Sequence, residues 1–114
     1  HYRHHAHADP FFLPGMQDIT SHVDFSAIAH AAAESKLEVL GYASQAQFLI
    51  NCGITELMAR TPAEAAAKFL PLANQANRLM SPAEMGELFK VMALGRGFSA
   101  PLLGFREGDR RNAL

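Results

Sequence analysis

The sequence predicts an α/β fold that is mostly helical and contains two short strands. Several stretches place apolar residues at helical spacing, most clearly over residues 46–58. Two other runs, 37–42 and 101–106, predict strands, and about 60 residues of mainly helical pattern lie between them. Because two strands alone form only a marginal sheet, we expect this chain to be a piece of a larger α/β protein whose other strands lie upstream.

Composition excludes several classes of protein. The 114 residues are 49% hydrophobic and 18% charged, with a formal charge of −1, which is typical of one folded domain without a basic field for nucleic acid. No apolar run approaches the roughly 20 residues of a membrane span. The single cysteine, Cys52, excludes a disulfide framework and favours a reducing compartment.

The first half of the chain predicts a loop, a helix and a strand. Residues 1–24 are rich in His, Pro, Gly and Asp and are expected to be a loop. Asp24 is a candidate cap for a helix that reaches about Lys36. The run 37–42 then alternates in part and contains β-branched and aromatic residues, which indicates a strand.

The second half predicts mainly helix. Ser44 and the residue three positions later form a capping-box pattern, which predicts the start of a long helix with its apolar stripe over residues 46–58. Gly53 lies inside that stripe and indicates a close approach of another backbone. Two further helices are expected to begin at the similar motifs TPAE (61–64) and SPAE (81–84). The first helix should break or kink near Pro71, and the second should end near residue 95 or 97. A second strand is expected over 102–106.

Histidines crowd the opening of the chain. Four of the six lie in the first seven residues, HYRHHAH, and neutral imidazoles can bind zinc, nickel or copper. No second group of ligands at a suitable spacing accompanies them, so we predict no metal site here. We expect instead a loop that packs on a cleft or lines it.

The loop QDITSHVDF, residues 17–25, gathers acceptors, a hydroxyl and an imidazole before a helix. His22 is a candidate proton acceptor or substrate-orienting group, and Asp18 and Asp24 are candidate ligands of a cation. An equally weighted alternative is that Asp24 and Ser21 only cap the helix and that His22 is a satisfied loop residue. Gln45 and Gln47 could bind a substrate amide or guanidinium, although simple capping is favoured for them.

Taken together, HYRHHAH, QDITSHVDF, GYASQAQFLINCGI and SPAEMGELFKVMALGRG resemble one family, the MidA-like S-adenosylmethionine-dependent methyltransferases. This family includes a mitochondrial arginine methyltransferase that assists assembly of respiratory complex I. The resemblance covers essentially the whole chain but only the C-terminal third or so of a typical member. It therefore implies a C-terminal segment of a class I (Rossmann-like) methyltransferase, with the glycine-rich donor loop and the acidic ribose ligand lying upstream.

The resemblance also implies an organisation and a set of site residues. Residues 1–43 would supply the loop, helix and strand, 44–98 a helical insertion over the cofactor cleft, and 99–114 a final antiparallel strand and tail. S-adenosylmethionine would be bound mainly by the missing upstream part. On the substrate side, the candidate catalytic residues are Asp18, His22 and Asp24, and the candidate substrate-binding residues are Thr20, Gln45 and Gln47.

These observations lead to a main functional hypothesis and two alternatives. The first is methylation of a protein, with arginine as one possible acceptor, by a chain that is inactive without its upstream part. The expected location is the bacterial cytoplasm or the mitochondrial matrix, and the sequence does not define the oligomeric state. The alternatives are a helical protein-interaction module without catalysis and, less favoured, a metal-handling protein.

Overall fold

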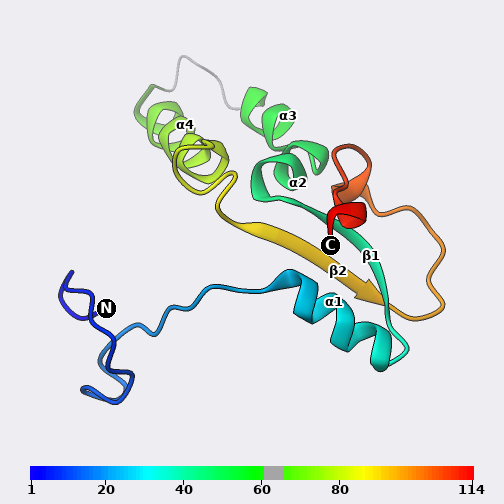
Figure 1. The fold of residues 1–114 in the computed structure, drawn as a ribbon. Coiled ribbons are helices and arrows are strands. Elements are labelled where there is room, and N and C mark those ends of the chain that lie inside the picture. Colours follow the sequence, from blue (N-terminus) through cyan, green and yellow to red (C-terminus); the bar gives the residue numbers. More distant parts are fainter. Residues whose placement is uncertain (61–65) are drawn as a thin grey trace.

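The computed structural model describes residues 1–60 and 66–114 (Figure 1). A looped N-terminal segment, extended over residues 18–24, leads into the first helix, and a two-stranded sheet with short helices on either side follows. In chain order, the elements are α1 (Phe25–Glu34), β1 (Glu38–Ser44), α2 (Gln45–Asn51), α3 (Ile54–Ala59), α4 (Ala66–Met80), β2 (Lys90–Gly95) and the 3₁₀ turns η1 (Leu103–Phe105) and η2 (Arg111–Ala113).

The sheet is an antiparallel pair of β1 and β2, in which Tyr42 lies opposite Met92 and a bulge interrupts the register between Val39 and Gly41. The two faces of β1 are covered by different parts of the chain. On one face the Tyr42 ring packs on Phe25 of α1, with the ring centroids 5.2 Å apart. On the other face Phe105 of η1 fills the space beside Gly41, where a side chain would collide with its ring. Helical elements therefore cover both faces, as in α/β proteins.

The predicted first helix and first strand are confirmed. Asp24 caps α1 by accepting a hydrogen bond from the Ala27 amide at 3.0 Å. The helix ends where Lys36 adopts a left-handed backbone, and the Arg96 guanidinium donates to the carbonyls of Ser35 and Lys36. The strand begins one residue later than predicted and continues to Ser44, which also caps α2.

The long helix expected behind Ser44 is two helices. Gly53 separates α2 from α3 with φ of +93°, a left-handed conformation that a glycine adopts without penalty. Our inference that Gly53 allows a close backbone approach was wrong for the described residues, among which a side chain there would meet only the Glu56 carboxylate at an ordinary 3.5 Å. Its backbone conformation explains the glycine.

The prediction of the second strand was wrong in position. Residues 102–106, expected as a strand, contain the 3₁₀ turn η1, and the predicted helix after Ser81 is a series of turns followed by β2. Two turns fold back on Ser81, whose carbonyl accepts from the amides of Glu84 and Gly86. The apolar residues after these turns pair with β1 instead of continuing a helix. An antiparallel partner for β1 was predicted correctly, although from the wrong residues.

Two further predictions concern α4. The expected start at 61–64 lies outside the described residues. The expected break at Pro71 is not observed, because α4 continues through this residue to Met80.

The core of the described chain is small. No large side chain is fully buried, and the buried hydrophobic residues are three alanines and Phe105. Many large apolar side chains are exposed instead, among them Phe11 at 83% and Leu88 at 69%. The interior is centred on β1, where Phe48 of α2 packs on Phe105. The described residues thus leave much apolar surface uncovered.

Candidate functional site

An open groove of about 690 Å³ lies where β1 ends and β2 begins. One wall is the extended segment before α1, which contributes Thr20, Ser21 and His22. The opposite wall is formed by residues from the end of the turns and the start of β2. The other lining residues are His1, Val23, Phe25, Tyr42, Leu88, Phe89 and Lys90. The groove therefore combines aromatic side chains with two histidines, the hydroxyls of Thr20 and Ser21, and the Lys90 ammonium group.

The fold positions these groups through several elements. Phe25 begins α1 directly behind the Asp24 cap, and its ring packs against Tyr42 near the end of β1. Because His22 lies only two residues before this cap, α1 and its packing on the sheet hold the His22 backbone beside the groove. The His22 side chain is exposed to solvent, so a bound molecule can reach it.

A small ion-pair cluster borders the groove at Lys90. Glu87 accepts from Arg110 at 2.6 Å and from the Lys90 ammonium, through both its carboxylate and its backbone carbonyl. The hydrogen bond from Arg110 holds the pKa of Glu87 below its ordinary value, and the nearby Lys90 charge acts in the same direction. The same contact raises the pKa of Arg110. The cluster joins the C-terminal segment to the start of β2.

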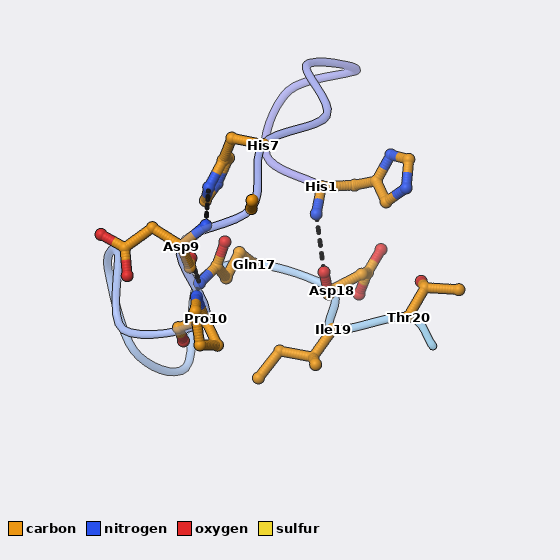
Figure 2. Close-up of a pocket in the computed structure, with 9 residues that line it drawn as sticks. His1, His7, Asp9, Pro10, Gln17, Asp18, Ile19 and Thr20 are labelled. Carbon is orange, nitrogen blue, oxygen red and sulfur yellow. Dashed lines mark hydrogen bonds between the residues drawn. The ribbon is translucent and has the colours of Figure 1, made fainter. Parts of the chain in front are cut away.

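A smaller hollow of about 180 Å³ lies in the N-terminal loop and shares His1 and Thr20 with the groove (Figure 2). Its loop is ordered by local bonds. The Asp9 amide donates to Nδ1 of His7 at 3.2 Å, and the Gln17 amide group donates to the carbonyls of Asp9 and Pro10. His1 and Asp18 exchange two backbone hydrogen bonds across the loop. Asp18 thus lines the hollow rather than the larger groove.

The six predicted site residues do not all meet in one place. Thr20 and His22 line the groove, and Asp18 lines the hollow together with Thr20. The Asp24 carboxylate caps α1. Gln45 donates to the Leu79 carbonyl at 2.9 Å and so joins α2 to α4, whereas Gln47 donates to Asn51 at 3.2 Å within α2.

Four lining residues were missed by the sequence analysis: Tyr42, Leu88, Phe89 and Lys90. Lys90 lies in the stretch from 81–84 to about 95 or 97 that was expected to be a helix. The apolar run after Lys90 fits a strand as readily as a helix, and this was the feature of the sequence that could have placed Lys90 in the groove. Had that run been assigned as a strand, Lys90 would have been placed at its start, beside the end of β1.

Other classes of site find no support in the described residues. Over 1–60 and 66–114, no group of three His, Cys, Asp or Glu side chains is arranged to hold a metal ion. In the same part of the chain, no helix has the length and apolar character needed to cross a bilayer.

Comparison with known proteins identifies the relatives of this chain. Residues 1–43 match a family described as putative S-adenosyl-L-methionine-dependent methyltransferases. The mitochondrial protein arginine methyltransferase NDUFAF7 of Mus musculus is 36% identical over 96 residues, which cover 82% of this chain and 21% of that protein.

Two solved structures from Burkholderia thailandensis are 54% identical to the whole chain with a TM-score of 0.91. One is described as an uncharacterised protein, and the other as a likely methyl transferase bound to S-adenosyl-homocysteine. These relatives define a class of methyl-transferring proteins that use S-adenosylmethionine. Together they support a MidA-like family of S-adenosylmethionine-dependent methyltransferases as the family that this chain resembles over part of its members' length. It spans 21% of the mouse relative and 30% of each solved structure.

Proposed function

We propose that this chain forms the acceptor side of a methyltransferase domain that modifies a protein, with arginine as the acceptor residue. The observation that carries the proposal is the groove at the end of β1, in a segment 54% identical to a structure bound to S-adenosyl-homocysteine. In open α/β sheets, ligands bind outside the carboxyl ends of the strands. The printed name of the mouse relative, an arginine methyltransferase, supports the choice of acceptor.

The residues of this chain do not fit the methyl donor itself. A donor site of this kind needs a glycine-rich turn between a strand and a helix, where backbone amides approach the ligand closely. The strand-to-helix junction of the described residues, β1 to α2, instead has Ser44 as its cap and contains no glycine between Tyr42 and Phe48. Donor binding is therefore assigned to the part of the domain beyond this chain, within a class I (Rossmann-like) sheet.

The groove can orient an acceptor and remove its proton. Methylation of a guanidinium nitrogen releases one proton, and a base must lie within hydrogen-bond reach of it. His22 is the imidazole on the extended wall of the groove, and Thr20 adds a hydroxyl for orientation. Asp24 is committed to its cap, which leaves His22 as the proposed proton acceptor. The aromatic base formed by Phe25 and Tyr42 would hold the acceptor by stacking.

The test is a chimera in which this chain replaces the matching 30% of the Burkholderia thailandensis protein. Titration calorimetry should show S-adenosyl-homocysteine binding to the chimera and none to the 114-residue chain. Methyl transfer is then measured on an array of arginine-containing peptides, with lysine-matched peptides as the control. Tight binding of S-adenosyl-homocysteine by the chain alone would contradict the assignment of the donor site.

A pair of histidine variants tests the role of the groove. His22→Ala should lower methyl transfer by the chimera about 100-fold or more while leaving S-adenosyl-homocysteine affinity unchanged. His30→Ala is the matched control, because His30 is exposed on α1 and pairs with Glu34 at 3.6 Å, and it should retain full activity. Equal activities of the two variants would remove His22 from the mechanism. A chimera that binds a protein partner but never transfers methyl groups would favour the interaction-module alternative.

Cellular location follows the relatives in this proposal. The mouse relative is mitochondrial by name, and the solved relatives are bacterial. We therefore propose the mitochondrial matrix or the bacterial cytoplasm, according to the source of the chain. Cell fractionation followed by immunoblotting would test this assignment.

A further inference from the structure

The charges that line the groove at the end of β1 are all of one sign. Of the described residues that line it, none carries a carboxylate. Lys90 supplies an ammonium group, and His1 and His22 add positive charge when they are protonated. An acceptor guanidinium in this groove therefore meets no counter-ion among the described lining residues, and it is repelled by Lys90.

The start of β2 holds Lys90 at the groove. Lys90 lies opposite Ser44 in the antiparallel ladder, and the carbonyl of the preceding Phe89 accepts from the Gln45 amide at 2.9 Å. The Lys90 side chain is only 20% exposed. A charge in such a partly desolvated position acts more strongly on a bound molecule than a charge on open surface, because less water screens it.

Glu87 contacts Lys90 but does not neutralise it. Both carboxylate oxygens of Glu87 accept from the Arg110 guanidinium, at 2.6 and 3.2 Å, in a bidentate pair. The Lys90 ammonium lies 3.4 Å from the same carboxylate and also donates to the Glu87 backbone carbonyl. Two cations thus share one carboxylate, which leaves a net positive charge. A lysine ammonium has three N–H donors, and only two of them are used among the described residues.

We propose that Lys90 is a specificity-determining residue that binds the carboxylate of an acidic side chain in the acceptor segment, so that the groove selects arginines with an Asp or Glu nearby. The proposal rests on the proposed function for the arginine acceptor. An acidic neighbour would fill the unused donor of Lys90 and offset the repulsion between Lys90 and the acceptor guanidinium. If the groove of about 690 Å³ is as wide as it is long, it is roughly 9 Å across, so the acidic residue should lie within about three residues of the arginine in an extended segment.

The affinity of the chimera for peptides, measured by fluorescence anisotropy without a methyl donor, tests the proposal. Each labelled peptide has a central arginine and one neighbour that is Glu, Gln or Lys, placed in turn at each nearby position. At the favoured position, the Glu peptide should bind about 5-fold more tightly than the Gln peptide, and the Lys peptide should bind most weakly. The preference should shrink as the salt concentration rises.

Charge reversal separates a direct contact from a structural role. Lys90→Glu should invert the preference, so that the Lys peptide binds about 5-fold more tightly than the Glu peptide. A variant that had only lost structure would bind all peptides more weakly and would not invert the order. Lys36→Glu is the matched control, because Lys36 is exposed just after α1 and lines neither the groove nor the hollow. It changes the net charge equally and should keep the preference for Glu.

Two results would overturn the role of Lys90. One is equal affinity for the Glu and Gln peptides at every position, or no binding of any peptide. The other is a preference for Glu that survives in Lys90→Glu. The outcome is independent of catalysis, because no donor is present. Equal methyl transfer to peptides with any neighbour would keep the proposed function and overturn the role of Lys90. An acidic preference that Lys90→Glu inverts, in a chimera that never transfers methyl groups, would support the role of Lys90 and contradict the proposed function.

Discussion

Asn51 allows the clearest test of what holds the C-terminal segment onto α2. Its side chain is 4% exposed and donates to two backbone carbonyls, those of Gly104 at 2.9 Å and Glu107 at 2.8 Å. Its oxygen accepts from Gln47 at 3.2 Å. Asn51 thus joins the end of α2 to the turn that carries Phe105 into the core. We predict that Asn51→Ala destabilises the protein more than an ordinary surface substitution.

The expected size follows from these contacts. Each of the two bonds to carbonyls contributes about 1 kcal/mol net, and the buried Gly104 carbonyl left without its donor adds about 1–2 kcal/mol. The total loss is therefore about 3–4 kcal/mol. With an m-value of about 1.5–2 kcal/mol per molar urea for a small domain, the urea midpoint should fall by roughly 2 M.

Urea unfolding followed by circular dichroism is the assay, with Asn74→Ala as control. Asn74 is exposed on α4, so its replacement should change stability by no more than about 0.5 kcal/mol. Asn51→Asp adds a further check, because a carboxylate facing two carbonyls should have a raised pKa. That variant should be least stable at neutral pH and should recover part of its stability as the pH falls and the carboxyl gains a proton. An Asn51→Ala midpoint equal to that of Asn74→Ala would refute this account.

Three further predictions concern packing, charge and capping. Gly104→Ala should cost about 1–3 kcal/mol in urea unfolding, because the Phe48 ring occupies the space that the new methyl group needs, and an unchanged midpoint would contradict this packing. The pair of Glu87 and Arg110 should contribute no more than about 1 kcal/mol, since both side chains are nearly half exposed. The pKa of Glu87 is lowered in the folded protein, so the stabilisation from this pair should be complete at pH values above 4.5, the ordinary pKa of the group. The stabilisation should disappear as the pH falls through the lowered pKa of the folded state. Glu87→Gln should therefore remove this part of the acid dependence of Tm. Asp24→Ala should cost about 1 kcal/mol through loss of the α1 cap, whereas Asp24→Asn should retain most of the stability, and equal losses in the two variants would argue against capping.

Local signals in the sequence predicted the elements whose boundaries are set by neighbouring residues. Asp24 begins α1 and Ser44 begins α2, because each side chain caps an amide three residues further along the chain. The strand before Ser44 was also predicted, since a β-branched and an aromatic residue favour it. Of the groove residues, His22 was named from the polar loop, and Thr20 was named from the family resemblance.

The tertiary structure decided the features that depend on distant residues. The run Val91-Met92-Ala93-Leu94 fits a helix or a strand locally, and its pairing with β1, nearly 50 residues earlier, selects the strand. Lys90 and Tyr42 reach one groove for the same reason. The sequence by itself determined the helix caps and the first strand, because these depend on contacts within a few residues. Folding decided the partner of β1 and the lining of the groove, because hydrogen bonds between distant segments determine both.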